Sequence, residues 1–218
     1  PQGMPGWRLQ QASALAWRDG AFSLSELCLT AGDPQLCASA KQDTAGNLDA
    51  SYRLRALPLA LLLNAMGESA LPVRVDGDLQ GDGKLHRSAA GALSGHASVC
   101  SARGSITWTE HADAPLLSYG GFALNADFGA SGQHFTLRTG LDHGGRLDGQ
   151  ISLTGKQQAL DGRLDLRLDN LAFVELLTGT LANVHGQVNS SFRFGGTLAQ
   201  PAVSGDAILL RTKTHLYC

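Results

Sequence analysis

Two cysteines, Cys28 and Cys37, have the spacing in this sequence that most readily suggests chemistry. A glycine and a proline lie between them and let the chain fold back, so a local disulfide is geometrically feasible. Closing so short a loop would stabilise the fold by about 2–3 kcal/mol. A disulfide would also imply an oxidising compartment, the periplasm or the outside of the cell. The alternative is a pair of buried thiols in the cytosol, and we favour the disulfide.

Other metal-ligating residue types do not follow a known pattern. His96, Cys100 and His111 have a spacing that matches no zinc signature. The segment 76–83 faintly resembles a calcium loop, but Arg87 stands where that loop needs a bidentate glutamate. A hairpin turn is therefore the preferred interpretation of 76–83, and we expect no metal site.

Catalytic motifs are not found either. Asp165 and Asp169 alternate with Arg163 and Arg167, which is more typical of a solvated surface than of an acid/base pair. The sequence has no Gly-x-Ser-x-Gly elbow, phosphate loop or dinucleotide fingerprint. We therefore expect neither a cofactor nor enzymatic activity.

The composition indicates an all-β protein. Of 218 residues, 27 are Gly, 43% are hydrophobic and 17% are charged, with a net charge of −2. The charge gives no electrostatic footprint for nucleic acid, and the hydrophobic content argues against disorder. The longest apolar run, Leu59–Leu63, is far short of the ~20 residues that a membrane span needs. No signal peptide is recognisable, and we expect an internal piece of a longer protein.

Turn signals separate the segments of the chain. Asp-Gly is typical of two-residue hairpin turns, although some of the glycines fall in phase with inward positions. The pairs are Asp19-Gly20, Asp76-Gly77, Asp82-Gly83, Asp148-Gly149 and Asp161-Gly162.

Between these signals the residues alternate with period two. In 160–169, for example, glycine and leucines alternate with aspartates and arginines, which predicts a sheet with one apolar and one polar face. Two segments, 57–66 and 171–177, are instead apolar at helical spacing and end at Gly67 and Gly179. We predict a long antiparallel sheet that curls over itself as a β-taco, an open hydrophobic groove, with two short amphipathic helices.

The whole chain, 1–218, is expected to form one continuous β-groove segment. A strands–helix–strands pattern is present twice, which suggests repeat-like units at about 48–155 and 160–211. Residues 212–218 break the pattern and form an atypical tail.

The apolar face itself is the candidate binding site. The sequence offers no second layer to cover it, and a continuous exposed apolar strip usually marks a binding site. Acyl chains would suit such a strip, whereas a sheet that packs shut would make the same residues a closed core. The predicted groove lining is Phe122, Leu124, Phe128, Phe135, Leu137, Ile151, Leu153, Leu164, Leu166, Leu168, Val184, Val188, Phe192 and Phe194.

Three consecutive segments resemble a known family. An amphipathic segment at 166–177 is followed by a Gly-x-Val strand at 181–188 and by Gly-Thr-Leu-x-x-Pro-x-Val-x-Gly within 194–205. This order resembles the TamB family of AsmA-like repeating β-groove proteins. The stretch 28–62 looks like the middle-to-late region of that family, and the resemblance covers roughly 24–210.

The resemblance implies a periplasmic bridge protein of a Gram-negative bacterium, with an inner-membrane anchor outside this chain. It implies phospholipid transport towards the outer membrane, and autotransporter secretion and assembly together with the outer-membrane partner TamA. The alternative function is therefore a scaffold that guides autotransporter or outer-membrane protein strands. A β-helix adhesin and a hydrolase rank below both, because neither has its expected motifs in the sequence.

Overall fold

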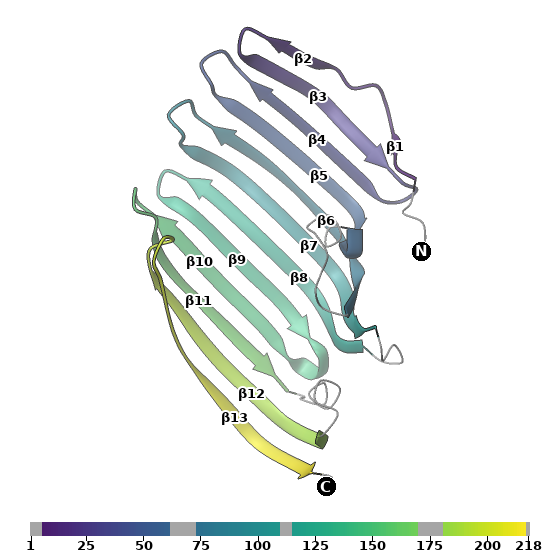
Figure 1. Cartoon of the computed structure of the whole chain (residues 1–218), viewed down its shortest axis with the longest axis vertical. Coiled ribbons are helices and arrows are strands. Elements are labelled where there is room, and N and C mark those ends of the chain that lie inside the picture. Colours follow the sequence, from purple (N-terminus) through teal and green to yellow (C-terminus); the bar gives the residue numbers. More distant parts are fainter. Residues whose placement is uncertain (1–5, 62–72, 110–114, 170–180, 217–218) are drawn as a thin grey trace.

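The fold is a single antiparallel β-sheet. The structure, a computed structural model, describes residues 6–61, 73–109, 115–169 and 181–216 (Figure 1). The sheet has 13 strands in the order β1-β3-β4-β5-β6-β7-β8-β9-β10-β11-β12-β13, and β2 also pairs with β3. The all-β class and the long antiparallel sheet are therefore confirmed.

Neighbouring strands are nearly always consecutive in the chain, as the alternating pattern predicts. A 3-10 turn, η1 (Asp142–Gly144), joins two of them. The strands are β1 (Arg8–Leu9), β2 (Leu15–Arg18), β3 (Ala21–Thr30), β4 (Gln35–Gln42), β5 (Leu48–Pro58), β6 (Val73–Arg87), β7 (Leu93–Trp108), β8 (Pro115–Gly129), β9 (Gly132–Leu141), β10 (Arg146–Thr154), β11 (Ala159–Leu168), β12 (Leu181–Gly196) and β13 (Pro201–Leu216).

The two predicted helices fall largely outside the described residues. Of the first, 57–66, Leu57 and Pro58 end strand β5 and residues 59–61 are helical. The rest of that segment, and all of 171–177, lie outside the described residues. Among the described residues, no helix is long and apolar enough to span a bilayer.

Only one Asp-Gly pair is a turn. Asp19 and Gly20, with φ of +50° and +80°, join β2 to β3. The other four pairs lie inside β6, β10 and β11, so the hairpin interpretation of 76–83 is wrong. Glycine occurs in tight turns, but within a strand it also leaves room for a neighbouring group that approaches closely. The glycines of these four pairs lie within strands, so this second role applies to them.

Two tyrosines lie over glycines on other strands of the sheet, one or two strands away. A side chain at Gly77 or Gly104 would collide with the Tyr119 hydroxyl, and one at Gly83 would collide with the Tyr52 ring. The Tyr119 hydroxyl lies 3.1 Å from Ser101 Oγ. The glycines thus make room for aromatic rings that pack flat on one face of the sheet.

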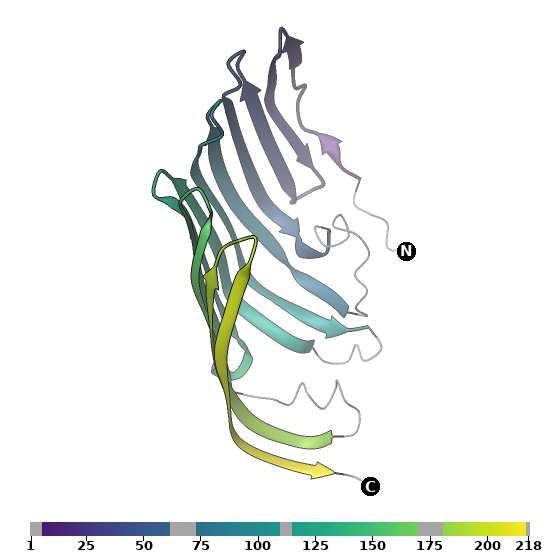
Figure 2. The ribbon, with the colours of Figure 1, turned by 60° about the vertical axis from the view of Figure 1, so that its left-hand side comes forward.

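Bulges bend the sheet along a belt across its middle strands. The register shifts between β5 and β6, between β6 and β7, and between β8 and β9. Ala56 and Gly121, with φ of +47° and +63°, lie at two of these shifts. A bulge kinks its strand and increases the twist, so these shifts curve the sheet. β12 and β13, whose bend is most visible in Figure 2, have register shifts of their own between residues 182 and 187.

The glycine–tyrosine contacts give the first testable prediction. Gly104→Ala places a methyl group against the Tyr119 ring and the Asp76 carbonyl and should lower the free energy of unfolding by about 1–3 kcal/mol. Gly129→Ala is the matched control, because nothing lies within 4 Å of its added Cβ. Urea denaturation followed by circular dichroism measures both, and equal midpoints would contradict the packing described.

Candidate functional site

A ladder of apolar residues crosses the entire sheet. Directly paired residues on antiparallel strands point to the same face, so the register can be followed from one strand to the next. Starting from β1, it connects Leu9, Leu29, Leu36, Leu54, Gly81, Val99, Leu124, Leu137, Gly149, Leu164, Phe192 and Gly205. We call this set the first ladder; it contains only leucine, valine, phenylalanine and glycine.

A second ladder lies beside the first on the same face, and each of its residues is two positions from a residue of the first ladder in the same strand. It connects Leu27, Ala38, Tyr52, Gly83, Ala97, Ala126, Phe135, Ile151, Gly162, Phe194 and Val203. Neither ladder contains a charged residue, so the apolar face is continuous from β3 to β13.

The predicted lining residues whose side chains are described lie on this face. The two ladders contain seven of them, which are Leu124, Leu137, Leu164, Phe192, Phe135, Ile151 and Phe194. The register places five more in neighbouring rows of the same face, which are Phe122, Phe128, Leu153, Leu168 and Val188. Leu166 follows Leu164 by two positions in β11. Val184 is in β12, but its side chain lies outside the described part.

The face also extends over strands that the predicted lining omits. Leu29, Leu36 and Leu54 of the first ladder, and Tyr52 of the second, come from β3 to β5. The alternation of apolar and polar residues at 48–55 could have predicted an apolar face for β5 from the sequence alone. Only the register shows that these N-terminal strands continue the same face.

The apolar face is open to solvent. None of the predicted lining residues with a described side chain is buried, and Leu124 is 39% exposed. The chain exposes 14556 Å², against about 9,600 Å² for a compact monomer of 22.8 kDa. A single layer explains this excess, because one face of the sheet has no covering element in the described part of the chain.

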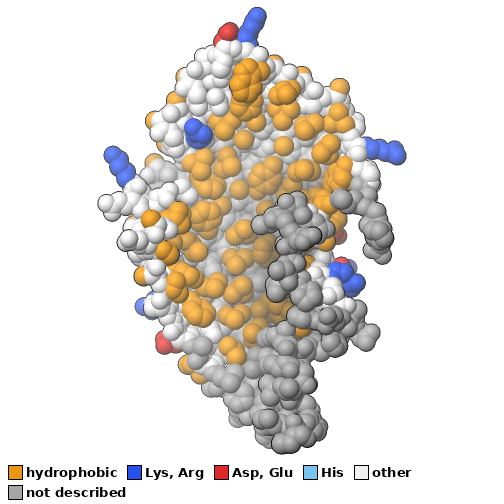
Figure 3. All heavy atoms as spheres, in the orientation of Figure 1, with side chains coloured by type: hydrophobic (Ala, Val, Ile, Leu, Met, Phe, Trp, Pro, Cys, Tyr) orange, Lys and Arg blue, Asp and Glu red, His pale blue; other side chains and the backbone are white. Residues whose placement is uncertain are grey.

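The apolar face lies on the inside of the bend. Figure 3 shows hydrophobic side chains spread across it, with charged side chains mainly at its margins. In Figure 2 this face lies towards the right, where the ends of β12 and β13 curve round. The curved sheet therefore forms an apolar trough.

Charged pairs occupy the opposite face. Arg163 Nε lies 2.6 Å from Asp165 Oδ2, and Arg167 Nε lies 2.8 Å from Asp169 Oδ1. The hydrogen bond from Arg163 holds the pKa of Asp165 below its usual value, with a further contribution from Ser191. These aspartates are thus ion-paired along an exposed polar face.

Tyr52 is a polar anchor within the apolar face. Its hydroxyl donates a hydrogen bond of 3.0 Å to the Ser98 carbonyl. Burial, as the largest effect, raises the pKa of Tyr52. The phenol therefore stays neutral and hydrogen-bonded on the face that carries the apolar residues.

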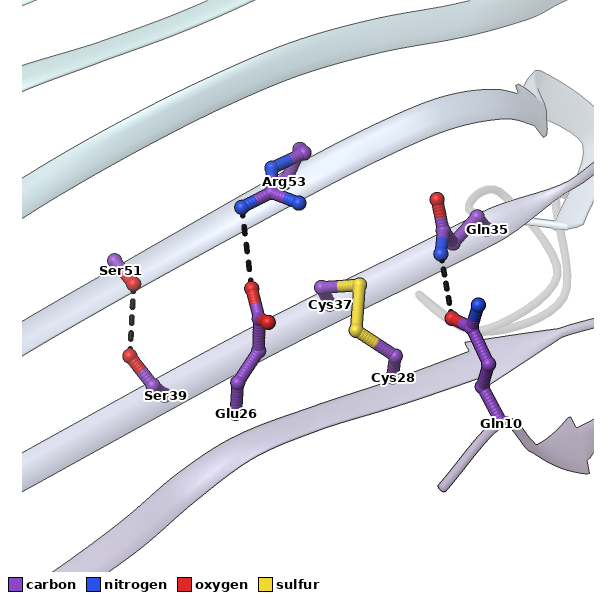
Figure 4. A network of polar contacts seen from close by, with 8 residues as sticks. All are labelled: Gln10, Glu26, Cys28, Gln35, Cys37, Ser39, Ser51 and Arg53. Carbon is purple, nitrogen blue, oxygen red and sulfur yellow. Dashed lines mark hydrogen bonds and ion pairs between the residues drawn. A yellow bond between two sulfur atoms is a disulfide. The ribbon is translucent and has the colours of Figure 1, made fainter. Parts of the chain in front are cut away.

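The predicted disulfide is confirmed. Cys28 and Cys37 are directly opposite each other on β3 and β4, with their Cα atoms 4.1 Å apart and both residues buried. The bond lies on the polar face, near the Glu26–Arg53 ion pair of 3.1 Å (Figure 4). It joins two strands without occupying the apolar trough.

These features define a class of protein built from one curled antiparallel sheet with an open apolar inner face. A family model described as TamB, N-terminal domain, matches residues 3–209. The chain belongs to the TamB family. The match is to the N-terminal domain of that family, so a placement in its middle-to-late region is not confirmed. No solved structure matches the chain.

The disulfide gives the second prediction. Reduction should lower the free energy of unfolding by about 2–3 kcal/mol, because the bond closes a loop between residues nine apart. Urea denaturation with and without dithiothreitol measures the difference. The control is Cys28→Ser with Cys37→Ser, which should unfold like the reduced protein and ignore the reductant; a reductant effect that persists in this variant would contradict the prediction.

Proposed function

We propose that this chain is a non-enzymatic segment of a periplasmic bridge that carries phospholipid acyl chains along its apolar face towards the outer membrane. The observation that carries the proposal is the uncharged first ladder, which crosses the sheet on an exposed face. An exposed apolar strip of this length needs an apolar occupant, because water contact with it is unfavourable.

The dimensions of the trough suit acyl chains. The first ladder crosses twelve strands, and at about 4.8 Å per strand it extends for roughly 50 Å. One leaflet of a bilayer core is about 15 Å thick, so several chains could follow one another along the face. Each methylene that contacts the face instead of water contributes about 0.8 kcal/mol to the free energy of binding. The headgroups would stay in water at the open side of the trough.

Membership of the TamB family and the disulfide support the proposed location. A disulfide persists in an oxidising compartment such as the periplasm. The family supports a role in the cell envelope, and we propose an inner-membrane anchor in a segment outside this chain and an outer-membrane partner similar to TamA.

A second candidate function uses the same trough for protein. In the described part of the chain β13 pairs only with β12, and an edge strand of this kind can pair with an added strand. The trough would then guide autotransporter or outer-membrane protein strands during assembly with TamA.

Lipid binding gives the third prediction. Leu124→Asp places a carboxylate in the first ladder, and losing contact with about two methylenes should weaken binding of a fluorescent phospholipid about tenfold. Asn125→Asp changes the adjacent residue, which is exposed on the polar face, and should bind as the wild type does. Fluorescence titration measures both, with circular dichroism to confirm folding, and equal affinities for the two variants would contradict the proposal.

Photo-crosslinking gives the fourth prediction and separates the two candidate functions. A benzophenone amino acid in place of Phe192, in the full-length protein in cells, should trap phospholipid, detected by mass spectrometry. The same probe at Arg193, which lies on the opposite face, should trap none. Unfolded polypeptide trapped at 192 without lipid would favour the assembly scaffold instead.

A further inference from the structure

Three residues of metal-binding types lie side by side on the polar face. The register pairs His96 of β7 with Asp127 of β8, and pairs Asp127 with His134 of β9. Directly opposite residues have Cβ atoms about 4.5–5.5 Å apart, so Asp127 has an imidazole on each side. All three residues are exposed. Their ligand atoms do not all lie within 4.8 Å of one another in the structure, so the side chains must rotate towards one another to share an ion.

Each histidine has a polar partner on the neighbouring strand on the side away from Asp127. His134 Nδ1 lies 2.9 Å from Ser152 Oγ on β10. His96 Nε2 lies 3.7 Å from Asp82 Oδ2 on β6. These contacts leave the other nitrogen of each ring available, and metal-bound histidines usually hold their second nitrogen in such a contact.

The central carboxylate is also available. Within the described part of the chain, Asp127 makes no hydrogen bond or ion pair. Lys84 is the other cross-strand neighbour of His96, and Asp82, which contacts His96, lies two positions before Lys84 on β6.

We propose that His96, Asp127 and His134 form a binding site for a divalent transition-metal ion of the Zn²⁺ type. Two imidazole nitrogens and one carboxylate oxygen are a common donor set for zinc. Calcium and magnesium take oxygen ligands, so the two imidazoles disfavour them. Three protein ligands leave a further coordination position for water.

The expectation of no metal site was based on spacing along the chain, whereas the proposed site depends on which residues the sheet register brings together. His96 and His134 are 38 positions apart, and two hairpins bring them to either side of Asp127. The ligand atoms of Glu26, Cys28 and Cys37 already lie within 4.8 Å of one another. Their sulfurs, however, are bonded to each other, so this second group is unavailable while the disulfide persists.

The proposed ion would join three consecutive strands from the polar side. It would leave the apolar face free, because paired residues of the His96 row point away from the two ladders. The site is therefore independent of lipid binding and can be tested separately.

Zinc titration of the purified chain, without an affinity tag, is the fifth prediction. Cys100→Ser and Cys218→Ser in all samples remove the thiols outside the disulfide. Calorimetry should show one strong Zn²⁺ site per chain, and Co²⁺ should produce visible absorption bands. Asp127→Asn and His134→Gln should each weaken binding about tenfold or more.

His86→Gln is the matched control. His86 is an exposed histidine on the same face, 2.8 Å from Asp49, and its loss should leave the affinity unchanged. Circular dichroism confirms that each variant is folded. The proposal is overturned if the parent chain does not bind Zn²⁺, if Asp127→Asn binds as tightly as the parent, or if His86→Gln loses as much affinity as His134→Gln.

Discussion

No layer covers the apolar face in the part of the chain that the structure describes, and the rest of the described structure depends on this constraint. In the described part of the chain, one sheet provides both faces, and its buried hydrophobic residues are few: Cys28, Cys37, Leu57 and Leu79. Stability must therefore come largely from backbone hydrogen bonds and from cross-strand contacts within the layer. The free energy that a packed core would gain from burial is left available for an external apolar molecule.

Curvature turns this exposed face into a trough. The bulges near Ala56 and Gly121 and the glycines beneath Tyr52 and Tyr119 all act on strands β5 to β8. Without them, the same alternating sequence would form a flatter sheet whose apolar face would be a site for aggregation. The polar face then carries the functions that the apolar face cannot, including ion pairs, the disulfide and the proposed metal site.

The sequence predicted the fold class because alternation with period two is a local property. It also predicted the Cys28–Cys37 bond, since a short loop with glycine and proline brings its ends together. The prediction failed at Asp76-Gly77 and Asp82-Gly83, because glycine serves equally in tight turns and beneath an aromatic ring. That ambiguity is resolved only by knowing that the Tyr119 side chain reaches Gly77 and that the Tyr52 side chain reaches Gly83.

Features that depend on register could not be predicted. Pairing of Leu124 with Val99 and Leu137, or of Asp127 with two histidines, depends on where every hairpin turns and where every bulge adds a residue. An error of one residue in the position of a turn or a bulge would move the side chains of the strand that follows to the opposite face of the sheet. For this reason the sequence indicated an apolar face along each strand but not the ladders that join them.

The proposed transport function requires that lipid occupies the apolar face and only that face. Single nitroxide labels placed in turn at residues 122–128 of β8 test it directly, through their collision rate with a water-soluble nickel reagent. On addition of phospholipid, we expect fewer collisions at 122, 124, 126 and 128 and unchanged collisions at 123, 125 and 127. No change at any position, or an equal reduction on both faces, would contradict it.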